Sequence, residues 1–373
     1  MFDLAIVGTS PMLLLEALNA AIGGSSVIIV DKSRNLGGAW QSPDIVGMAG
    51  VEIGCHYIEP IEPVYGLLAN LGVVLENSMP VALHKSKKVR QPVRFLMPKI
   101  GEYSAIKDLH YHRTGFAKSA IMAKLDMLKV HLQGVHRARS IQYPSGNSRA
   151  LVDNLVDQLR RYENVEFCNE QVEKAVSLAN DVCLKCVAGR TINTRKLVFG
   201  QRADFFIVAN GQKVRVDRQD ATAISVIINS AELPNLPARY VNVHDGKLVK
   251  RLCGFADPKG NYGIVAQVHK SAVDMSNING DSLAERCLDE LVNMGILQSS
   301  GCRSEVLMYE GSFIPCDQVI PMNTLLPSNV RLLYTYDLAK SILFRMAEWT
   351  YLREKHSYSV DQIKAIAKQV PMV

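Results

Sequence analysis

The chain lacks an apolar stretch long enough to cross a membrane. Such a helix needs about 18 to 20 consecutive apolar residues, and the best candidate is interrupted by Glu16 and Asn19. The first residues also lack the basic segment with which secretion signals begin. With 48% hydrophobic and 21% charged residues, the composition is that of an ordinary globular protein. We therefore expect a cytoplasmic protein without a transmembrane segment.

Cysteines are too sparse and scattered for a disulfide framework. The 373 residues contain 8 of them, which in a chain of this length indicates reduced thiols. Cys183 and Cys186 form one C-x-x-C pair, but no second pair of cysteines or histidines follows at the spacing of a metal site. We interpret both as structural thiols and predict no metal site.

The basic residues are unevenly distributed. The formal net charge is +6, and residues 84–139 contain many lysines and arginines against only Glu102, Asp108 and Asp126. The positive electrostatic field of such a segment attracts an anionic partner or substrate. The alternative interpretation is a solvated basic surface that has no partner. No nucleic-acid-binding motif accompanies the charge. We expect a small-molecule substrate, with an anionic one left open, and no nucleic acid.

The amino terminus has the pattern of a dinucleotide-binding unit. Residues 3–8 are apolar and β-prone, "GTSP" turns the chain, a Leu- and Ala-rich helix follows, and "SSVIIVD" is a second strand. This order implies a right-handed parallel crossover. The amino terminus of the helix would favour a phosphate. Asp31 stands about twenty residues after Gly8, where an acid typically binds a ribose hydroxyl.

The fingerprint lacks two of its glycines. Ser10 and Leu13 stand where the second and third are expected. Ser10 adds a hydroxyl that could bind a phosphate, whereas Leu13 is expected to push the helix away from the strand. Whether the site retains its nucleotide is left open.

A glycine pair after the second strand adds a more specific signal. The stretch "DKSRNLGGAW" (31–40) resembles the acid, spacer and Gly-Gly of the flavin amine oxidase and protoporphyrinogen oxidase superfamily, a pattern that UDP-galactopyranose mutase shares. Such glycines let the backbone pass close to the cofactor. Other stretches are similar to segments of the same superfamily. They are "EIGCHYIEP" and "VYGLLANLGV" (mutase branch), "YPSGNSRALVDNLVDQL", "NEQVEKAV" and "GRTINTRKLVFGQRADFFIVA".

The resemblance implies FAD as cofactor and a set of residues around it. It implies a histidine on the flavin in the mutase branch, which makes His56 the candidate catalytic residue. The family closes over the flavin with a Gly-Asp-type turn, and here Asp337 follows Tyr336 without a glycine. The candidate cofactor-binding residues are Gly8, Ser10, Pro11, Asp31, Lys32, Gly37, Gly38, Ala39, Trp40, Val172, Tyr336 and Asp337.

The expected fold class is α/β, a Rossmann-like FAD-binding domain of the glutathione-reductase type with an inserted α+β substrate domain. We expect a discontinuous FAD-binding domain at 1–75, 141–215 and 325–373, and a substrate or cap domain at 76–140 and 216–324. Helices are expected at 281–295, capped by Asp281 or Ser282, and as one last helix near the carboxyl terminus. The apolar residues of "AIMAKLDMLKVHL" (120–132) leave a homodimer open.

Three functions are compatible with this resemblance. The first is a FAD-dependent oxidoreductase that transfers a hydride from a small organic substrate to the flavin. The second is a non-redox flavoenzyme similar to UDP-galactopyranose mutase, favoured by His56. The third is a non-catalytic homologue that acts as a binding partner, as the broken fingerprint would suggest.

Overall fold

The structure is a computed structural model. It describes residues 1–54, 56–59, 61–78, 81–84, 87–89, 141–243, 246–257, 259–273, 275, 279–299, 301–335 and 337–369. Most of the basic segment 84–139 and all of 120–132 lie outside these residues. The expectations of an anion-attracting surface and of a dimer face therefore stay predictions.

The first sheet is built around a parallel core. Its strand order is β12-β11-β8-β9-β10-β1-β2-β7, and β18 pairs with β10. β1 lies parallel between β10 and β2, so the first and second strands of the expected crossover are neighbours. The strands are β1 (Phe2–Val7), β2 (Val27–Val30), β7 (Val165–Cys168), β8 (Val172–Ser177), β9 (Val182–Cys186), β10 (Thr191–Gly200), β11 (Phe206–Ala209), β12 (Gln212–Lys213) and β18 (Val330–Leu333).

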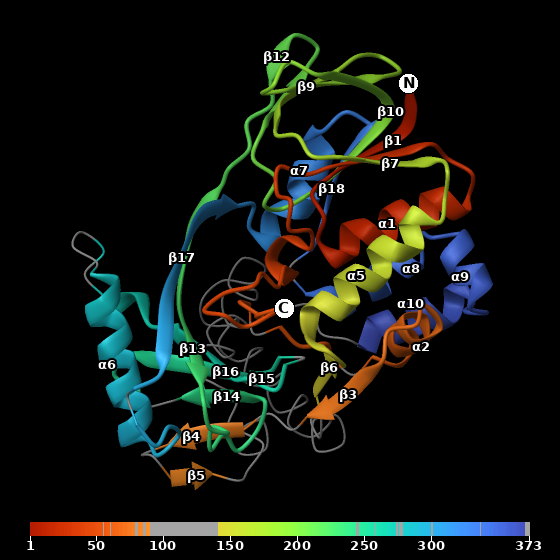
Figure 1. Cartoon of the computed structure of the whole chain (residues 1–373). Helices are drawn as coiled ribbons and strands as arrows, with labels where there is room; N and C mark the ends of the chain where they lie inside the picture. The colour runs from red at the N-terminus through yellow and green to blue at the C-terminus, as the bar shows by residue number, and fades with distance from the viewer. Residues whose placement is uncertain are drawn as a thin grey trace, which may run out of the picture.

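Helices α1, α5 and α8 cover one face of this sheet, and α7 lies on the other. Leu4 and Ile6 of β1 pack among the helices of the first face, whereas Ala5 and Val7 pack on the opposite face, on the side of α7. Burial on both faces explains why β2 and the last four residues of β1 are apolar throughout. Figure 1 shows α1, α5 and α8 together beside the sheet. The helices are α1 (Pro11–Ile22), α2 (Glu62–Asn70), α5 (Asn147–Arg160), α7 (Val319–Leu325), α8 (Leu338–Met346), α9 (Tyr351–Lys355) and α10 (Val360–Gln369).

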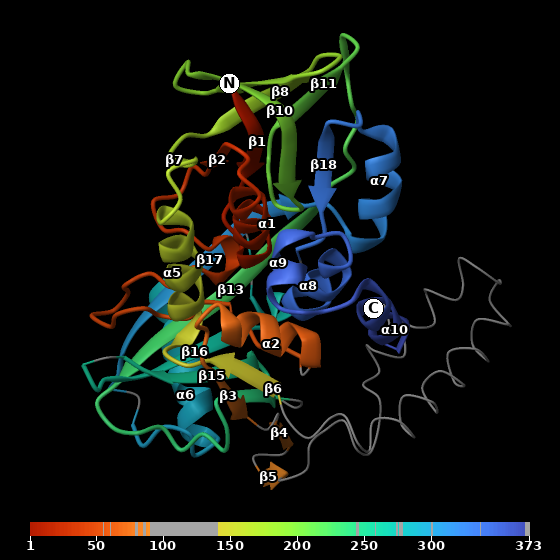
Figure 2. The same cartoon turned by 90° about the vertical axis from the view of Figure 1, so that its right-hand side faces the viewer.

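The second sheet is mainly antiparallel, in the order β17-β13-β16-β15-β14-β4-β5. Helix α6 (Gly280–Asn293) covers one of its faces, and the other packs against the chain around Met48 and Val51. Figure 2 shows this sheet below the first. Its strands are β4 (Val81–His84), β5 (Lys87–Val89), β13 (Gln219–Ser230), β14 (Tyr240–Val243), β15 (Val249–Ala256), β16 (Tyr262–Val268) and β17 (Arg303–Phe313).

Shorter elements connect the two sheets. β3 (Leu75–Ser78) and β6 (Ile141–Pro144) form a separate antiparallel pair. Single 3-10 turns are η1 (Gly38–Trp40), η3 (Lys270–Ala272) and η4 (Cys316–Gln318). The mixed α/β architecture with a parallel sheet agrees with the expected fold class. The division into a cofactor domain and a substrate domain stays a proposal.

Two expectations on the helices were wrong. Asn279 caps α6, since its side chain accepts a hydrogen bond from the Ser282 amide at 3.1 Å; neither Asp281 nor Ser282 is the cap. The carboxyl-terminal segment forms three helices instead of one. The chain breaks after α8, and Trp349 is fully buried in the helical layer. Burial of this large ring decides the path of the chain here, over local helix propensity.

Within the described residues, no helix is long and apolar enough to span a membrane. The described cysteines are free thiols.

Candidate functional site

The turn between β1 and α1 is tied to two other loops by one hydroxyl. Gly8 has φ +105°, a conformation that a side chain would strain. The buried Thr9 hydroxyl donates to the Asp31 carboxylate at 2.6 Å and accepts from the Gly37 amide at 3.0 Å. Thr9, which follows Gly8 directly, thus joins Asp31 to Gly37, two positions that the sequence singled out. The fingerprint leaves this position unspecified, which is why the sequence did not point to it.

Asp31 lies at the end of β2, as expected. Its second oxygen accepts a hydrogen bond from the Ser33 amide at 2.9 Å. Because a carboxylate has about four acceptor positions, two protein bonds leave it able to accept from a ligand hydroxyl. The carboxylate is therefore both fixed in orientation and able to bind a further donor.

The glycine pair passes close to the start of α1. Gly37 and Gly38 have φ +110° and +58°. A Cβ at Gly37 would lie 2.9 Å from the Val152 side chain, and one at Gly38 would lie 3.5 Å from the Ser10 nitrogen. The Ser10 hydroxyl is buried without a hydrogen-bond partner among the described residues. An unsatisfied buried hydroxyl at a helix start is a position where a phosphate oxygen would be favourable.

Leu13 does not separate α1 from the sheet, contrary to our expectation. A Cβ at Gly8 would lie 3.0 Å from the Leu13 Cδ1 atom, and one at Gly200 would lie 3.2 Å from it. Leu13 itself is buried. Gly8, directly after β1, and Gly200, at the end of β10, therefore make room for the side chain that replaces the third glycine of the fingerprint. The close packing of helix and sheet is thus kept.

Trp40 and His56 form a stacked pair next to the glycine pair. Their ring centroids are 4.5 Å apart and the ring planes differ by 13°. The His56 Nε2 atom lies 2.6 Å from the Ala39 carbonyl oxygen. Because a carbonyl only accepts, Nε2 carries the proton and Nδ1 is the free acceptor of the ring. A Cβ at Gly54 would overlap this ring, so the histidine lies directly over the backbone of its own loop.

Burial lowers the pKa of His56 to about 4, with smaller contributions from Arg202 and Arg251, while the bond to Ala39 opposes the shift. The ring is therefore neutral at pH 7. As placed, it orients Trp40 and Ala39 and does not carry a positive charge.

This lowered pKa predicts a pH dependence of stability. Below about pH 6.5 the unfolded chain binds a proton at His56 that the folded protein binds only near pH 4. The contribution of neutral His56 to the free energy of unfolding is therefore complete above pH 6.5 and is lost as the pH falls toward 4. Since the ring is partly exposed, we expect a loss of about 2 kcal/mol. Urea unfolding of wild type and His56→Gln at pH 7 and pH 5 measures it, and an equal pH effect in both proteins would contradict the assignment.

A buried ion pair between Glu52 and Arg239 stabilises the loop that carries His56. The Glu52 carboxylate accepts from the His56 backbone amide at 3.1 Å and from Arg239 at 3.2 Å. The Glu52 side chain is 1% exposed, and Arg239 lies 4.7 Å over the Tyr143 ring. Burial raises the pKa of Glu52, which the Arg239 charge opposes. The sequence carried no signal for this pair, because its members come from the histidine loop and the start of β14.

The remaining predicted residues lie in different environments. Pro11 is the first residue of α1, Lys32 is exposed, and Val172 is buried in the core with Val30. Asp337 caps α8 through the Lys340 amide at 3.1 Å, and its carboxylate lies 3.1 Å from Lys340 Nζ. Tyr336 lies outside the described residues. The structure thus gathers the β1–α1 turn, Asp31, the glycine pair, Trp40 and His56.

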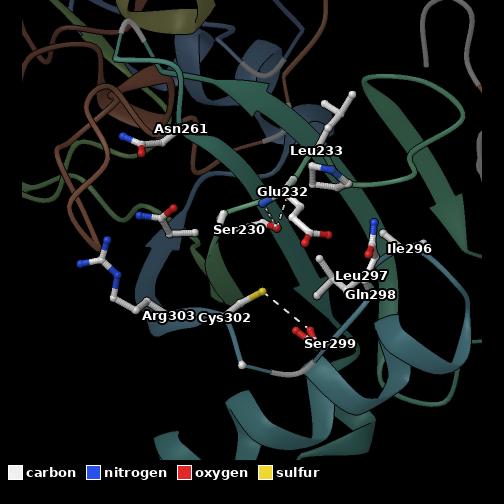
Figure 3. Close-up of a pocket in the computed structure, with 14 residues that line it drawn as sticks. Ser230, Glu232, Leu233, Asn261, Ile296, Leu297, Gln298, Ser299, Cys302 and Arg303 are labelled. Atoms are coloured by element: carbon white, nitrogen blue, oxygen red, sulfur yellow. Dashed lines mark hydrogen bonds between the residues drawn. The ribbon is translucent and has the colours of Figure 1, made fainter.

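A pocket on the second sheet lies away from these residues. It has a volume of about 260 Å³ and is lined by residues of the second sheet and α6–β17 loop, among them Glu232, Asn261 and Arg303 (Figure 3). None of the predicted site residues lines it. This pocket therefore lies apart from the hydrogen bonds and close backbone approaches that define the candidate site.

Comparisons with known proteins show the fold. No protein-family model and no curated protein sequence matches the chain. Among solved structures, the chain is similar to putrescine oxidase bound to putrescine, with a TM-score of 0.62, 13% identity, and coverage of 98% of this chain and 99% of that one. The chain is also similar to cyclohexylamine oxidase from Brevibacterium oxydans, with a TM-score of 0.62, 12% identity and coverage of 99% of both chains.

A structure of reduced UDP-galactopyranose mutase is also similar, with a TM-score of 0.58, 12% identity, and coverage of 100% of this chain and 97% of that one. The fold therefore agrees with the resemblance drawn from the sequence. At these identities the agreement concerns the fold alone.

Proposed function

We propose that the chain is a FAD-dependent oxidoreductase with an amine oxidase-like fold that acts on a small organic substrate. The hydrogen-bonded bridge from Asp31 through Thr9 to Gly37 carries this proposal. It holds the acid, the first turn and the glycine pair in one arrangement, although two glycines of the fingerprint are replaced. The whole-chain similarity to two amine oxidases supports it.

The residues present fit FAD. Asp31 would accept a ribose hydroxyl, and the Ser10 hydroxyl with the start of α1 would bind the pyrophosphate. Gly37 and Gly38 would bring backbone amides to the cofactor, because neither has a side chain in the way. When bound, FAD would supply the capacity to accept a hydride. Trp40 and His56 would form a flat wall beside it.

His56 gives a specific reason to keep the mutase-like alternative. The sequence resemblance places a histidine on the flavin in that branch, and here the ring is neutral and fixed by Ala39 and Trp40. A neutral, fixed ring suits a role in positioning the cofactor more than in proton transfer. A non-catalytic binding role is the third candidate, and the spectrum described next separates it from the other two.

The test is the visible absorbance spectrum of the purified protein, before heating and on the supernatant after heat denaturation. We expect flavin bands near one equivalent, released on denaturation, in wild type. For Asp31→Ala we expect cofactor binding weaker by about 1 to 3 kcal/mol, because a hydrogen bond to a charged group is lost. Asp181→Ala, a change of an acid at the turn between β8 and β9, is the matched control. A colourless wild type that does not bind added FAD would overturn the proposal.

A further inference from the structure

One face of the second sheet carries a polar row that crosses four neighbouring strands. The register pairs Asn242 with Arg251, Arg251 with Gln267, and Gln267 with Ser225. Partners opposite one another in a sheet point to the same face. The row lies on the face that packs against the chain around Met48, because neighbouring Tyr240 and Val265 belong to that core. α6 covers the opposite face.

This row meets the histidine loop. Gln267 Nε2 lies 3.5 Å from the Gly54 carbonyl oxygen, two residues before His56. Arg251 lies 3.5 Å from the Gln267 side chain and 5.1 Å over the Tyr240 ring. Tyr240 in turn contacts Tyr57 edge to face at 5.5 Å. The row therefore lies next to the loop that holds the stacked Trp40–His56 pair.

A second arginine approaches from the first sheet. Arg202 follows β10, and its guanidinium lies 4.8 Å over the Tyr309 ring of β17. Arg202 and Arg251 both act electrostatically on His56. Neither forms an ion pair with a carboxylate of the described residues. Tyr309 is two residues along β17 from Leu307, which pairs with Ser225, so its side chain lies on the same sheet face as the polar row. Two arginines from different sheets thus lie against one face of the second sheet.

Among the residues that the structure describes, the carboxylates of this loop and of this row of the sheet do not cancel this charge. Glu52, the carboxylate in the same loop, is paired with Arg239. On the sheet face, Glu305 ends the neighbouring row on β17, opposite Ile227. Two strands lie between it and Arg251, so the separation is about 14 Å at about 4.8 Å per strand. That exceeds the distance over which salt screens exposed charges, about 10 Å.

We propose that Arg251 and Arg202 bind an oxyanion of the substrate, a carboxylate or a phosphate, beside the Trp40–His56 pair. A planar guanidinium presents paired donors that match such an oxyanion, and Gln267 and Ser225 add neutral polar groups. The substrate would then carry the charge opposite to that of the amines named in the similar oxidases. This inference rests on the proposed function, because it takes the space next to this pair as the substrate site.

The test is titration calorimetry of the purified full chain with four probes that share a benzene ring. Benzoate and phenyl phosphate carry the oxyanion, benzylamine carries the opposite charge, and benzyl alcohol is neutral. We expect one of the two anions to bind at least about tenfold more tightly than benzylamine and benzyl alcohol. Which anion binds more tightly distinguishes a carboxylate from a phosphate. Equal or tighter binding of benzylamine would overturn the inference.

Arginine variants assign the binding to this place. Arg251→Gln should weaken anion binding about tenfold or more, whereas Arg251→Lys keeps the charge and should lose less. Arg215→Gln, a change of a 91% exposed arginine, is the control and should stay within about twofold. If Arg251→Gln does not fold by circular dichroism, Arg202→Gln replaces it. Unchanged anion affinity in a folded Arg251 or Arg202 variant would contradict the assignment.

Calorimetry does not depend on a flavin, so the experiments can reject the flavoenzyme and the oxyanion site independently of each other. A yellow protein without anion preference would keep the flavoenzyme and reject the oxyanion site. A colourless protein whose anion binding depends on Arg251 would reject FAD and keep the site. In a yellow protein, we also expect the bound anion to shift the visible bands, and that shift should be absent in Arg251→Gln.

Discussion

Replacing Glu52 by glutamine should destabilise the protein by about 3 to 5 kcal/mol, the cost of leaving one partner of a buried ion pair uncompensated. The Glu52 side chain is 1% exposed and that of Arg239 is 20% exposed. Removal of the carboxylate charge leaves the Arg239 guanidinium without its partner and weakens the bond to the His56 amide. Urea unfolding followed by circular dichroism measures the loss.

An exposed ion pair of similar geometry is the control for Glu52. Glu166 lies 2.6 Å from Arg190, with both side chains 44% exposed, so Glu166→Gln should cost less than about 1 kcal/mol. Similar losses of stability in Glu52→Gln and Glu166→Gln would mean that Glu52 is exposed to water in solution. Because Glu52 supports the loop that carries His56, its variant should also weaken cofactor binding, which Glu166→Gln should leave unchanged.

Replacing Glu16 by leucine is expected to have an effect of the same size, about 3 to 5 kcal/mol. Glu16 is buried in α1, where its carboxylate binds Arg345 through both oxygens and accepts from the Trp349 indole at 2.6 Å. Leucine leaves the buried Trp349 indole without a partner and Arg345 with only the half-exposed Glu348 carboxylate. An unsatisfied buried donor costs more than its bond contributes. Thermal unfolding of the variant measures the effect.

Glutamine at the same position separates the two interactions. Glu16→Gln keeps an oxygen that can accept from the indole of Trp349 but removes the charge opposite Arg345. We expect Glu16→Gln to lose clearly less stability than Glu16→Leu. The double variant Glu16→Leu with Arg345→Met also removes the charge that has lost its buried partner, and it should recover part of the stability lost with leucine. A double variant no more stable than Glu16→Leu would show that the ion pair contributes little.

The local pattern of the amino terminus was enough to predict the crossover unit. Apolar runs, a helix between them and an acid after the second strand determine strand, helix and strand order, because hydrophobic periodicity and turn residues act over a few positions. The glycine pair was also identifiable, since positive φ leaves glycine as the unstrained choice. Leu13 shows the limit. Its neighbour Gly200 lies far along the chain on β10, so the space that accommodates it does not appear in the local sequence.

The Asp31 acid, the glycine pair and the helix start were thus determined by the sequence itself. Only the tertiary structure brought Thr9 between Asp31 and Gly37, paired Glu52 with Arg239, and placed Arg251 next to the loop of His56. These contacts join residues from separate strands and loops, and a side chain's partner across a sheet depends on register and packing. The proposed oxyanion site depends on that long-range arrangement, which no local pattern specifies.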